Sequence, residues 1–359
     1  MKKRLWRFGS TGDKLNAVAV YGQVWQIRGC DRPDLAPNGV SGPQHFSISG
    51  WFALSLLNLS SHDRCYPSSP TIPKLRAILE LHEIMSLSKN IPTIKLAYDL
   101  YRASAGSVSK EPIVFIHGLF GSKINNRTVS KVFARDLARD VFCVDLRNHG
   151  DSPHDETHNY PALAADVENF IAEQGLQQSI LIGHSMGAKT AMAVALRSPE
   201  LVKAMICVDN SPADGKLSSA FPRYVEGLKQ VEAAHVKTSK QAYKILAEYE
   251  KSLTIQHFLL SNLKKQHHGN YHFRVPLDIL GASLNNMADF PFRADESRYD
   301  GPSLFIRGLR SKYASEDTFK AMKSFFPNCE IHDIDSGHWV ISEKPQEFIA
   351  AVESFVGKL

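Results

Sequence analysis

The sequence is poor in cysteine and contains no cysteine pair at a metal-binding spacing. Its 359 residues include five cysteines, Cys30, Cys65, Cys143, Cys207 and Cys329, and no two of them form a CxxC pair. An odd number without such a pair argues against a disulfide framework and against a zinc site, and predicts a reducing compartment. Cys143 and Cys207 stand within apolar runs and are predicted to be buried.

No hydrophobic run is long enough for a transmembrane helix. The best candidate, Phe46–Leu59, has 14 residues and is interrupted by Ser, Gly and Asn, whereas a spanning helix needs roughly 20 apolar residues. It also lies too far along the chain to be the core of a signal peptide. The sequence therefore predicts no transmembrane segment.

A basic folded domain is also lacking. The net charge is +5, but residues 1–80 hold 10 Lys and Arg against 5 Asp and Glu, so the remainder of the chain is neutral. A nucleic-acid-binding protein usually carries its basic charge on the folded domain, and we therefore expect no nucleic-acid partner. The apolar fraction of 43% excludes a globally disordered chain.

Residues 1–90 lack the regular pattern of the rest and are predicted to be an N-terminal extension, disordered or used for targeting. Met1–Phe8 is basic and free of acidic residues, as transit peptides are. However, Asp13, Asp31 and Asp34 follow, which such peptides avoid. Two interpretations stay open: an organelle address, and an inert tail on a cytoplasmic protein.

Residues 91–359 are predicted to form the folded domain, because short apolar runs alternate there with amphipathic segments. Several runs are continuously apolar, which is typical of strands buried on both faces. Strands that alternate with helices in this way predict an α/β fold with a doubly wound, mostly parallel sheet. The predicted strands are Pro112–Gly118, Asp140–Arg147, Ser179–His184, Ala204–Asn210, Ser303–Gly308 and Cys329–Asp335, and the predicted helices include Thr128–Asp140, Pro161–Glu173 and Gln346–Val356.

One connection is much longer than the others. More than 90 residues separate the strand that ends at Asn210 from the next predicted strand. A structureless loop of that length is uncommon in a compact domain. Helical patterns at Lys240–Ser252 and Leu253–Lys265 instead predict a helical cap over about residues 211–300, covering one end of the sheet.

The clearest chemical signal is the segment GHSMG around Ser185. It follows the apolar run SILI and opens the helical pattern AKTAMAVALR, which is the strand–turn–helix context that a G-x-S-x-G nucleophile requires. A serine hydroxyl is a weak nucleophile unless a neighbouring base takes its proton. We therefore predict Ser185 as a nucleophile and look for a base and an acid later in the chain.

A second glycine-containing loop, HGLFG, directly follows the strand IVFI. Backbone N–H groups that stabilise an oxyanion are worth about 2.7–4 kcal/mol each in acyl transfer. One such group is expected from the residue after the nucleophile, Met186, and the other from this loop, at Leu119. The pairing of this loop with the serine turn is more specific than either motif alone.

The predicted base is His338, because it follows the last predicted strand and precedes the terminal helix. The acid has two candidates. Lys312 stands where many proteins of this plan place an aspartate, and Asp317 lies farther along, in the next predicted helix. Asp209 ends the strand AMICVD beside the serine strand and keeps the order Ser, Asp, His. We favour Asp209 and keep Asp317 as the alternative.

The segment DLRNHGDSP, which leaves another predicted strand, contains several polar residues that could contact substrate. We favour a structural interpretation. Arg147 and Asp151 are predicted to join loops near the site.

The chain from about Ile91 to Leu359 resembles the α/β-hydrolase superfamily, through HGLFGS, DLRNHGDSP, GHSMGAKTAM, VDNSP and GHWV taken together. These motifs look like one subfamily, which includes bacterial short-acyl esterases, mitochondrial abhydrolase-domain proteins and fungal ethanol acetyltransferases. In that subfamily the acid is the aspartate of the VDxSP stretch, which matches Asp209. The resemblance implies Ser/Asp/His chemistry on an ester or thioester without a metal or cofactor, and often a mitochondrial address.

Three functions follow from these residues. The first is a serine hydrolase that cleaves a carboxylic ester or thioester, a small-molecule substrate, through an acyl-enzyme. The second is an acyltransferase, in which an alcohol such as ethanol takes the acyl group instead of water. The third is a non-catalytic binding protein on the same scaffold, which typically lacks one of the three residues.

Overall fold

The computed structural model describes residues 16–20, 23–27, 91–103, 110–176, 178–215, 217–265 and 271–359. The chain divides into two units, Met1–Pro70 and Thr71–Leu359. In the first unit, β1 (Asn16–Val20) pairs with β2 (Gln23–Ile27) in an antiparallel hairpin. The predicted basic N-terminal address and the apolar run Phe46–Leu59 lie outside the described residues.

A seven-stranded sheet organises the second unit, with the strand order β11-β10-β7-β6-β4-β5-β3. All six predicted strands are present and pair in parallel, which confirms the predicted α/β fold with a mostly parallel sheet. The sequence did not predict β3, an antiparallel edge strand paired with β5. The strands are β3 (Tyr98–Tyr101), β4 (Ile113–Ile116), β5 (Val141–Val144), β6 (Ser179–His184), β7 (Val202–Val208), β10 (Ser303–Gly308) and β11 (Cys329–Ile334).

Helices cover both faces of this sheet, and alternate residues of β4 show the division. Val114 and Ile116 belong to a core shared with α4 and α5, whereas Ile113 and Phe115 pack in a second core with α3 and α13. A strand whose successive side chains enter two cores has to be apolar throughout. The helices on the sheet are α3 (Arg127–Asp136), α4 (Tyr160–Glu173), α5 (Met186–Arg197), α11 (Phe319–Phe325), α12 (Val340–Glu343) and α13 (Pro345–Val356), with the short turns η1 (Lys123–Asn126), η2 (Pro199–Leu201) and η3 (Glu316–Thr318).

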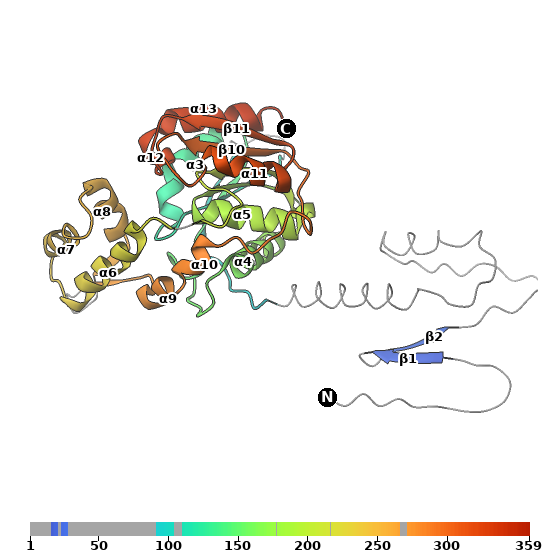
Figure 1. Ribbon diagram of the computed structural model, residues 1–359, viewed down its shortest axis with the longest axis horizontal. Helices are drawn as coiled ribbons and strands as arrows, with labels where there is room; N and C mark the ends of the chain where they lie inside the picture. The colour runs from blue at the N-terminus through green and yellow to red at the C-terminus, as the bar shows by residue number, and fades with distance from the viewer. Residues whose placement is uncertain are drawn as a thin grey trace, which may run out of the picture. The chain divides into compact units, whose positions relative to one another are not determined.

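The long connection between β7 and β10 forms a mainly helical insertion, and Figure 1 shows α6, α7 and α8 grouped on one side of the sheet. The predicted helix Leu253–Lys265 is too long, because α8 ends at Leu260 and the last three residues form a strand. Ser261 and Asn262 end the helix by donating side-chain hydrogen bonds to Phe258 O and Leu259 O. The insertion contains α6 (Ala220–Ala233), α7 (Ser239–Leu246), α8 (Leu253–Leu260), β8 (Leu263–Lys265), β9 (Tyr271–Phe273), α9 (Leu277–Ala282) and α10 (Leu284–Ala288).

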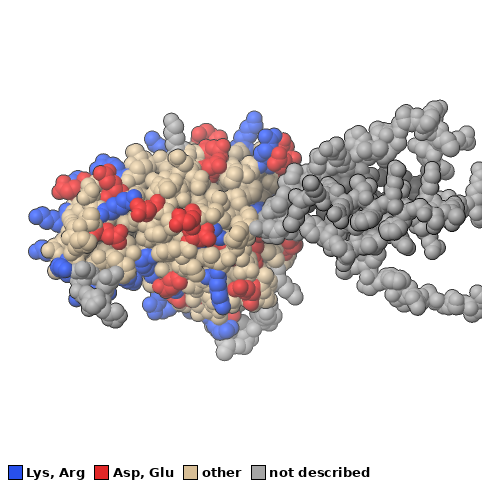
Figure 2. Space-filling model, turned by 90° about the horizontal axis from the view of Figure 1, so that it is seen from below, with Lys and Arg blue, Asp and Glu red and all other residues tan. Residues whose placement is uncertain are grey.

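Two features of the described residues match what the sequence predicted, namely mixed surface charge and buried cysteines. On the face in Figure 2, Lys and Arg side chains are interspersed with Asp and Glu side chains rather than gathered in one basic patch. Cys143 and Cys207 are fully buried, as predicted, and burial raises the pKa of the Cys143 thiol to about 12. Within the described part of the chain, no helix has the length and apolarity needed to cross a membrane.

Candidate active site

Ser185 lies in a strained turn between β6 and α5. Its backbone has φ 54° and ψ −116°, a left-handed conformation that is uncommon outside glycine and is typical of a serine held out for reaction. The flanking glycines are required by close backbone approach. A Cβ on Gly183 would lie 2.1 Å from Gly187 O, and one on Gly187 would lie 2.4 Å from Ile116 O.

The structure brings together the three side chains that the sequence singled out from distant parts of the chain. His338 Nε2 lies 3.0 Å from Ser185 Oγ, and His338 Nδ1 lies 2.6 Å from Asp209 Oδ2. Asp209 is fully buried, and Ser185 is 8% exposed. An imidazole that donates from Nδ1 to a buried carboxylate keeps Nε2 free to accept a proton from the serine hydroxyl.

The alternative acid, Asp317, lines the cavity beside Ser185 but is not part of the hydrogen-bonded series. It is exposed in η3, and among the described residues it makes no hydrogen bond to His338. Asp209 is instead held from β10: its Oδ1 accepts the N–H of Gly308 at 3.0 Å, and its Oδ2 accepts the hydroxyl of Ser311 at 2.5 Å. Sequence reasoning missed Ser311, which lies just before Lys312 in the loop where the aspartate was first sought.

Two further side chains that sequence reasoning missed hold the reacting groups in place. His184 donates from Nε2 to His338 O at 2.9 Å, and burial lowers the pKa of His184 to about 4, so its ring is neutral near pH 7. Asn210 donates its amide to Ser185 O at 3.1 Å. Their positions next to Ser185 and Asp209 in the sequence are the only signal that could have identified them.

The loop after β4 is held close to the serine. A Cβ on Gly118 would lie 3.3 Å from the Cβ of Ser185, so only glycine allows this approach without displacement. Phe120, with φ 61°, donates its N–H to His149 Nε2 at 3.1 Å. Leu119 and Met186 both line the cavity beside Ser185, and within the described residues the structure shows no acceptor for the Leu119 N–H.

The segment DLRNHGDSP has the structural role that the sequence favoured. Arg147 is 1% exposed and donates to both carboxylate oxygens of Asp166, at 2.6 and 2.8 Å. Asp145 is fully buried and forms an ion pair with Lys123 at 2.6 Å, and Asp151 also contacts the Lys123 ammonium. The Arg147–Asp166 and Lys123–Asp145 pairs are buried, and they join this segment to α4 and η1.

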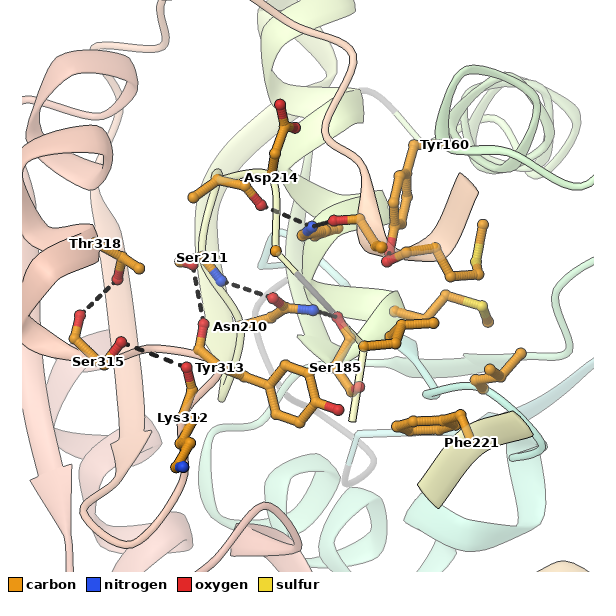
Figure 3. Close-up of a pocket in the computed structure, with 18 of the residues that line it drawn as sticks. Tyr160, Ser185, Asn210, Ser211, Asp214, Phe221, Lys312, Tyr313, Ser315 and Thr318 are labelled. Carbon is orange, nitrogen blue, oxygen red and sulfur yellow. Dashed lines mark hydrogen bonds between the residues drawn. The ribbon is translucent and has the colours of Figure 1, made fainter. Parts of the chain in front are cut away.

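A cavity of about 160 Å³ opens beside Ser185. Aromatic side chains lie on one side of the serine, and polar side chains lie on the other. Figure 3 shows Tyr160 and Phe221 on one side of Ser185, and Ser211, Lys312, Ser315 and Thr318 on the other. Leu119, Met186 and Met287 also line it. Over the described residues, no group of three or more His, Cys, Asp or Glu side chains is arranged to hold a metal ion.

The fold and these motifs define the class of protein. A model of the α/β-hydrolase fold family matches residues 111–345, and the chain belongs to this family. It is 38% identical to an sn-1-specific diacylglycerol lipase of Xenopus laevis, over 73% of this chain and 84% of the relative. It is 36% identical to a probable alcohol acetyltransferase of Saccharomyces cerevisiae, over 75% of this chain and 84% of the relative.

A solved structure of a marine microorganism esterase also matches this chain in fold. It matches with a TM-score of 0.68 and 28% sequence identity, covering 73% of this chain and all of the esterase chain. The predicted class, a carboxylic ester hydrolase of the α/β-hydrolase family, is confirmed by these relatives, and the acetyltransferase relative supports acyl transfer as the alternative.

Proposed function

We propose that the protein hydrolyses a carboxylic ester or thioester through a covalent acyl-enzyme on Ser185. The observation that carries this proposal is the hydrogen-bonded series Ser185 Oγ, His338 Nε2, His338 Nδ1 and Asp209 Oδ2, at 3.0 and 2.6 Å. His338 takes the serine proton as Ser185 attacks the acyl carbon, and it then gives that proton to the leaving alcohol or thiol. Asp209 selects the tautomer and stabilises the imidazolium.

The second half-reaction uses the same groups in reverse. His338 takes a proton from water, the resulting hydroxide attacks the acyl carbon, and the bond to Ser185 Oγ breaks as the serine recovers a proton. In both halves the negative charge develops on the carbonyl oxygen. We assign its stabilisation to the backbone N–H groups of Leu119 and Met186. The supporting observations are that both residues line the cavity beside Ser185 and that Met186 is the first residue of α5, whose N–H has no partner within the helix.

The cavity favours a small acyl group. A closed apolar cavity of about 150 Å³ accommodates benzene, a ligand of six heavy atoms. The cavity here is partly open and has polar as well as apolar lining, and its volume of about 160 Å³ has room for a similar number of atoms beside Ser185. We therefore propose a short-chain acyl ester or thioester as the substrate, rather than one with a long acyl chain enclosed in this cavity.

Acyl transfer to an alcohol is the second candidate, because one group of relatives carries the name alcohol acetyltransferase. We expect hydrolysis to dominate when water is the only acceptor. The test is the product ratio from an acetyl ester or thioester with and without ethanol, measured by gas chromatography. Free acid as the main product at every ethanol concentration supports hydrolysis, and ethyl ester exceeding free acid at millimolar ethanol would make transfer the main activity.

We propose that residues 1–90 form a separate extension that directs the protein to mitochondria. The supporting observation is the cluster of four positive charges without an acid in the first eight residues. We expect residues 1–90 fused to a fluorescent protein to colocalise with a mitochondrial marker. Diffuse cytosolic fluorescence from this fusion would contradict the proposal and leave the inert-tail interpretation.

A further inference from the structure

A buried lysine connects the nucleophile helix to both ends of the helical insertion. Lys189 lies four residues after Ser185 in α5, is 2% exposed and lines the cavity. Its ammonium donates to Ala213 O at 2.9 Å, before α6, and to Ala288 O and Asp289 O at 2.9 and 3.0 Å, at the end of α10. One side chain therefore fixes the segment that enters the insertion and the segment that leaves it.

Tyr160 fixes the same exit segment from the neighbouring helix. Its hydroxyl donates to Met287 O at 3.0 Å, and its side chain is 1% exposed and lines the cavity. The carbonyls of residues 287, 288 and 289 are thus all held by Tyr160 or Lys189. The Lys189 ammonium also lies 5.6 Å from the centroid of the Tyr160 ring, within the range of a cation–π interaction.

The two segments are also bonded to each other. Gly215 donates its N–H to Ala288 O at 3.0 Å, and Phe290 donates its N–H to Asp214 Oδ1 at 2.8 Å. Asp214, Met287 and Ala288 all line the cavity. The segments held by Lys189 are therefore themselves part of the cavity wall.

We propose that Lys189 and Tyr160 are positioning residues that fix this wall and thereby limit the length of the acyl group. The proposal rests on the proposed ester chemistry at Ser185. Because these two side chains hold the backbone of the wall rather than the reacting atoms, their loss should widen the cavity and leave the reaction of Ser185 itself intact.

Lysine fits this role better than an apolar residue of the same length. An ammonium has three donors, and three carbonyls accept them here. Two of these carbonyls belong to the last residue of α10 and the residue after it, where a helix leaves carbonyls without intrahelical partners and a positive charge is favourable. Burial lowers the pKa of Lys189 to about 8, against the opposing charges of Asp214 and Asp289, so the group is still mainly protonated at pH 7.

The test compares kcat/KM for p-nitrophenyl acetate and octanoate in the full chain and in three variants. Lys189→Met removes the ammonium at similar length, and Tyr160→Phe removes only the hydroxyl. Lys229→Met is the matched control, because this lysine lies in α6 of the same insertion, is half-exposed and pairs with Asp278 away from the cavity. The rate of fluorophosphonate labelling reports separately on the reaction at Ser185.

We expect the ratio of kcat/KM for the octanoate ester to kcat/KM for the acetate ester to rise on the order of 10-fold in Lys189→Met. This is the size of effect that one methylene group has on specificity in an apolar pocket. A smaller rise is expected in Tyr160→Phe, and none in Lys229→Met, with labelling rates within a few-fold of the parent. An unchanged ratio in folded Lys189→Met and Tyr160→Phe would overturn the proposal. If Lys189→Met does not fold, the activity ratio of Tyr160→Phe alone tests the proposal. Absent labelling of the parent would instead refute the proposed function.

Discussion

Replacing Ser185 with alanine is expected to abolish ester hydrolysis, with kcat reduced by about 10⁴ to 10⁶-fold, as when the nucleophile of a serine protease is removed. The Oγ of Ser185 is the atom within 3.0 Å of His338 Nε2, and alanine leaves the imidazole with no hydroxyl to activate. Fluorophosphonate labelling should disappear in the same variant. The measurement is steady-state kinetics with a short-chain p-nitrophenyl ester.

The fold should survive this substitution. The serine side chain is small, and its hydrogen bond to His338 contributes about 1 kcal/mol by the usual value for such a bond. Alanine must adopt the same left-handed backbone, as serine already does at φ 54°. We therefore expect nearly unchanged circular dichroism and Tm. Persistent hydrolysis or labelling in Ser185→Ala would place the nucleophile elsewhere.

Replacing Asp209 with asparagine is expected to reduce kcat by about 10⁴-fold, the effect of the same change in a well-studied protease triad, or about 5 kcal/mol in barrier height. Asparagine has nearly the same shape but no charge to stabilise the imidazolium. Its amide N–H can also donate to His338 Nδ1, which favours the tautomer that cannot take the serine proton. It also tolerates the left-handed backbone of Asp209, at φ 51°, so loss of folding should not explain the result.

Asp317→Asn is the matched control for this substitution, because the sequence offered Asp317 as the other candidate acid. Asp317 lines the cavity, but it is exposed and, among the described residues, is not bonded to His338, so we expect activity within a few-fold of the parent. Both variants should be assayed at one pH, with circular dichroism to confirm folding. A severe loss in Asp317→Asn with nearly normal Asp209→Asn would reverse the assignment of the acid.

The sheet could be predicted because its buried strands carry a strong signal. A strand such as Ile113–Ile116, apolar on both faces, contributes to two cores and has no polar position. The edge strand Tyr98–Tyr101 was missed because it is short and only partly buried. The hairpin of Leu263–Lys265 and Tyr271–Phe273 was missed for the same reason, since strands of three residues show no period.

The candidate site was predictable only where its residues follow strands. Parallel strands end at one edge of the sheet, so Ser185, Asp209 and His338 were placed near one another by topology alone. The partners of these groups depend on packing between distant elements. Ser311 bonds Asp209 across 102 residues, and Lys189 reaches Asp289 across 100 residues, distances in sequence that no local pattern records.

Titration with diethyl p-nitrophenyl phosphate, followed by peptide mapping, tests the central proposal most directly. The phosphorus atom is attacked as the acyl carbon would be, p-nitrophenol leaves, and the phosphoryl group stays on the nucleophile. We expect one equivalent of p-nitrophenol for each folded protein, complete loss of esterase activity, and the diethylphosphoryl group on Ser185. Release of p-nitrophenol with the label on another residue, or continued ester turnover in protein fully labelled at Ser185, would contradict the account.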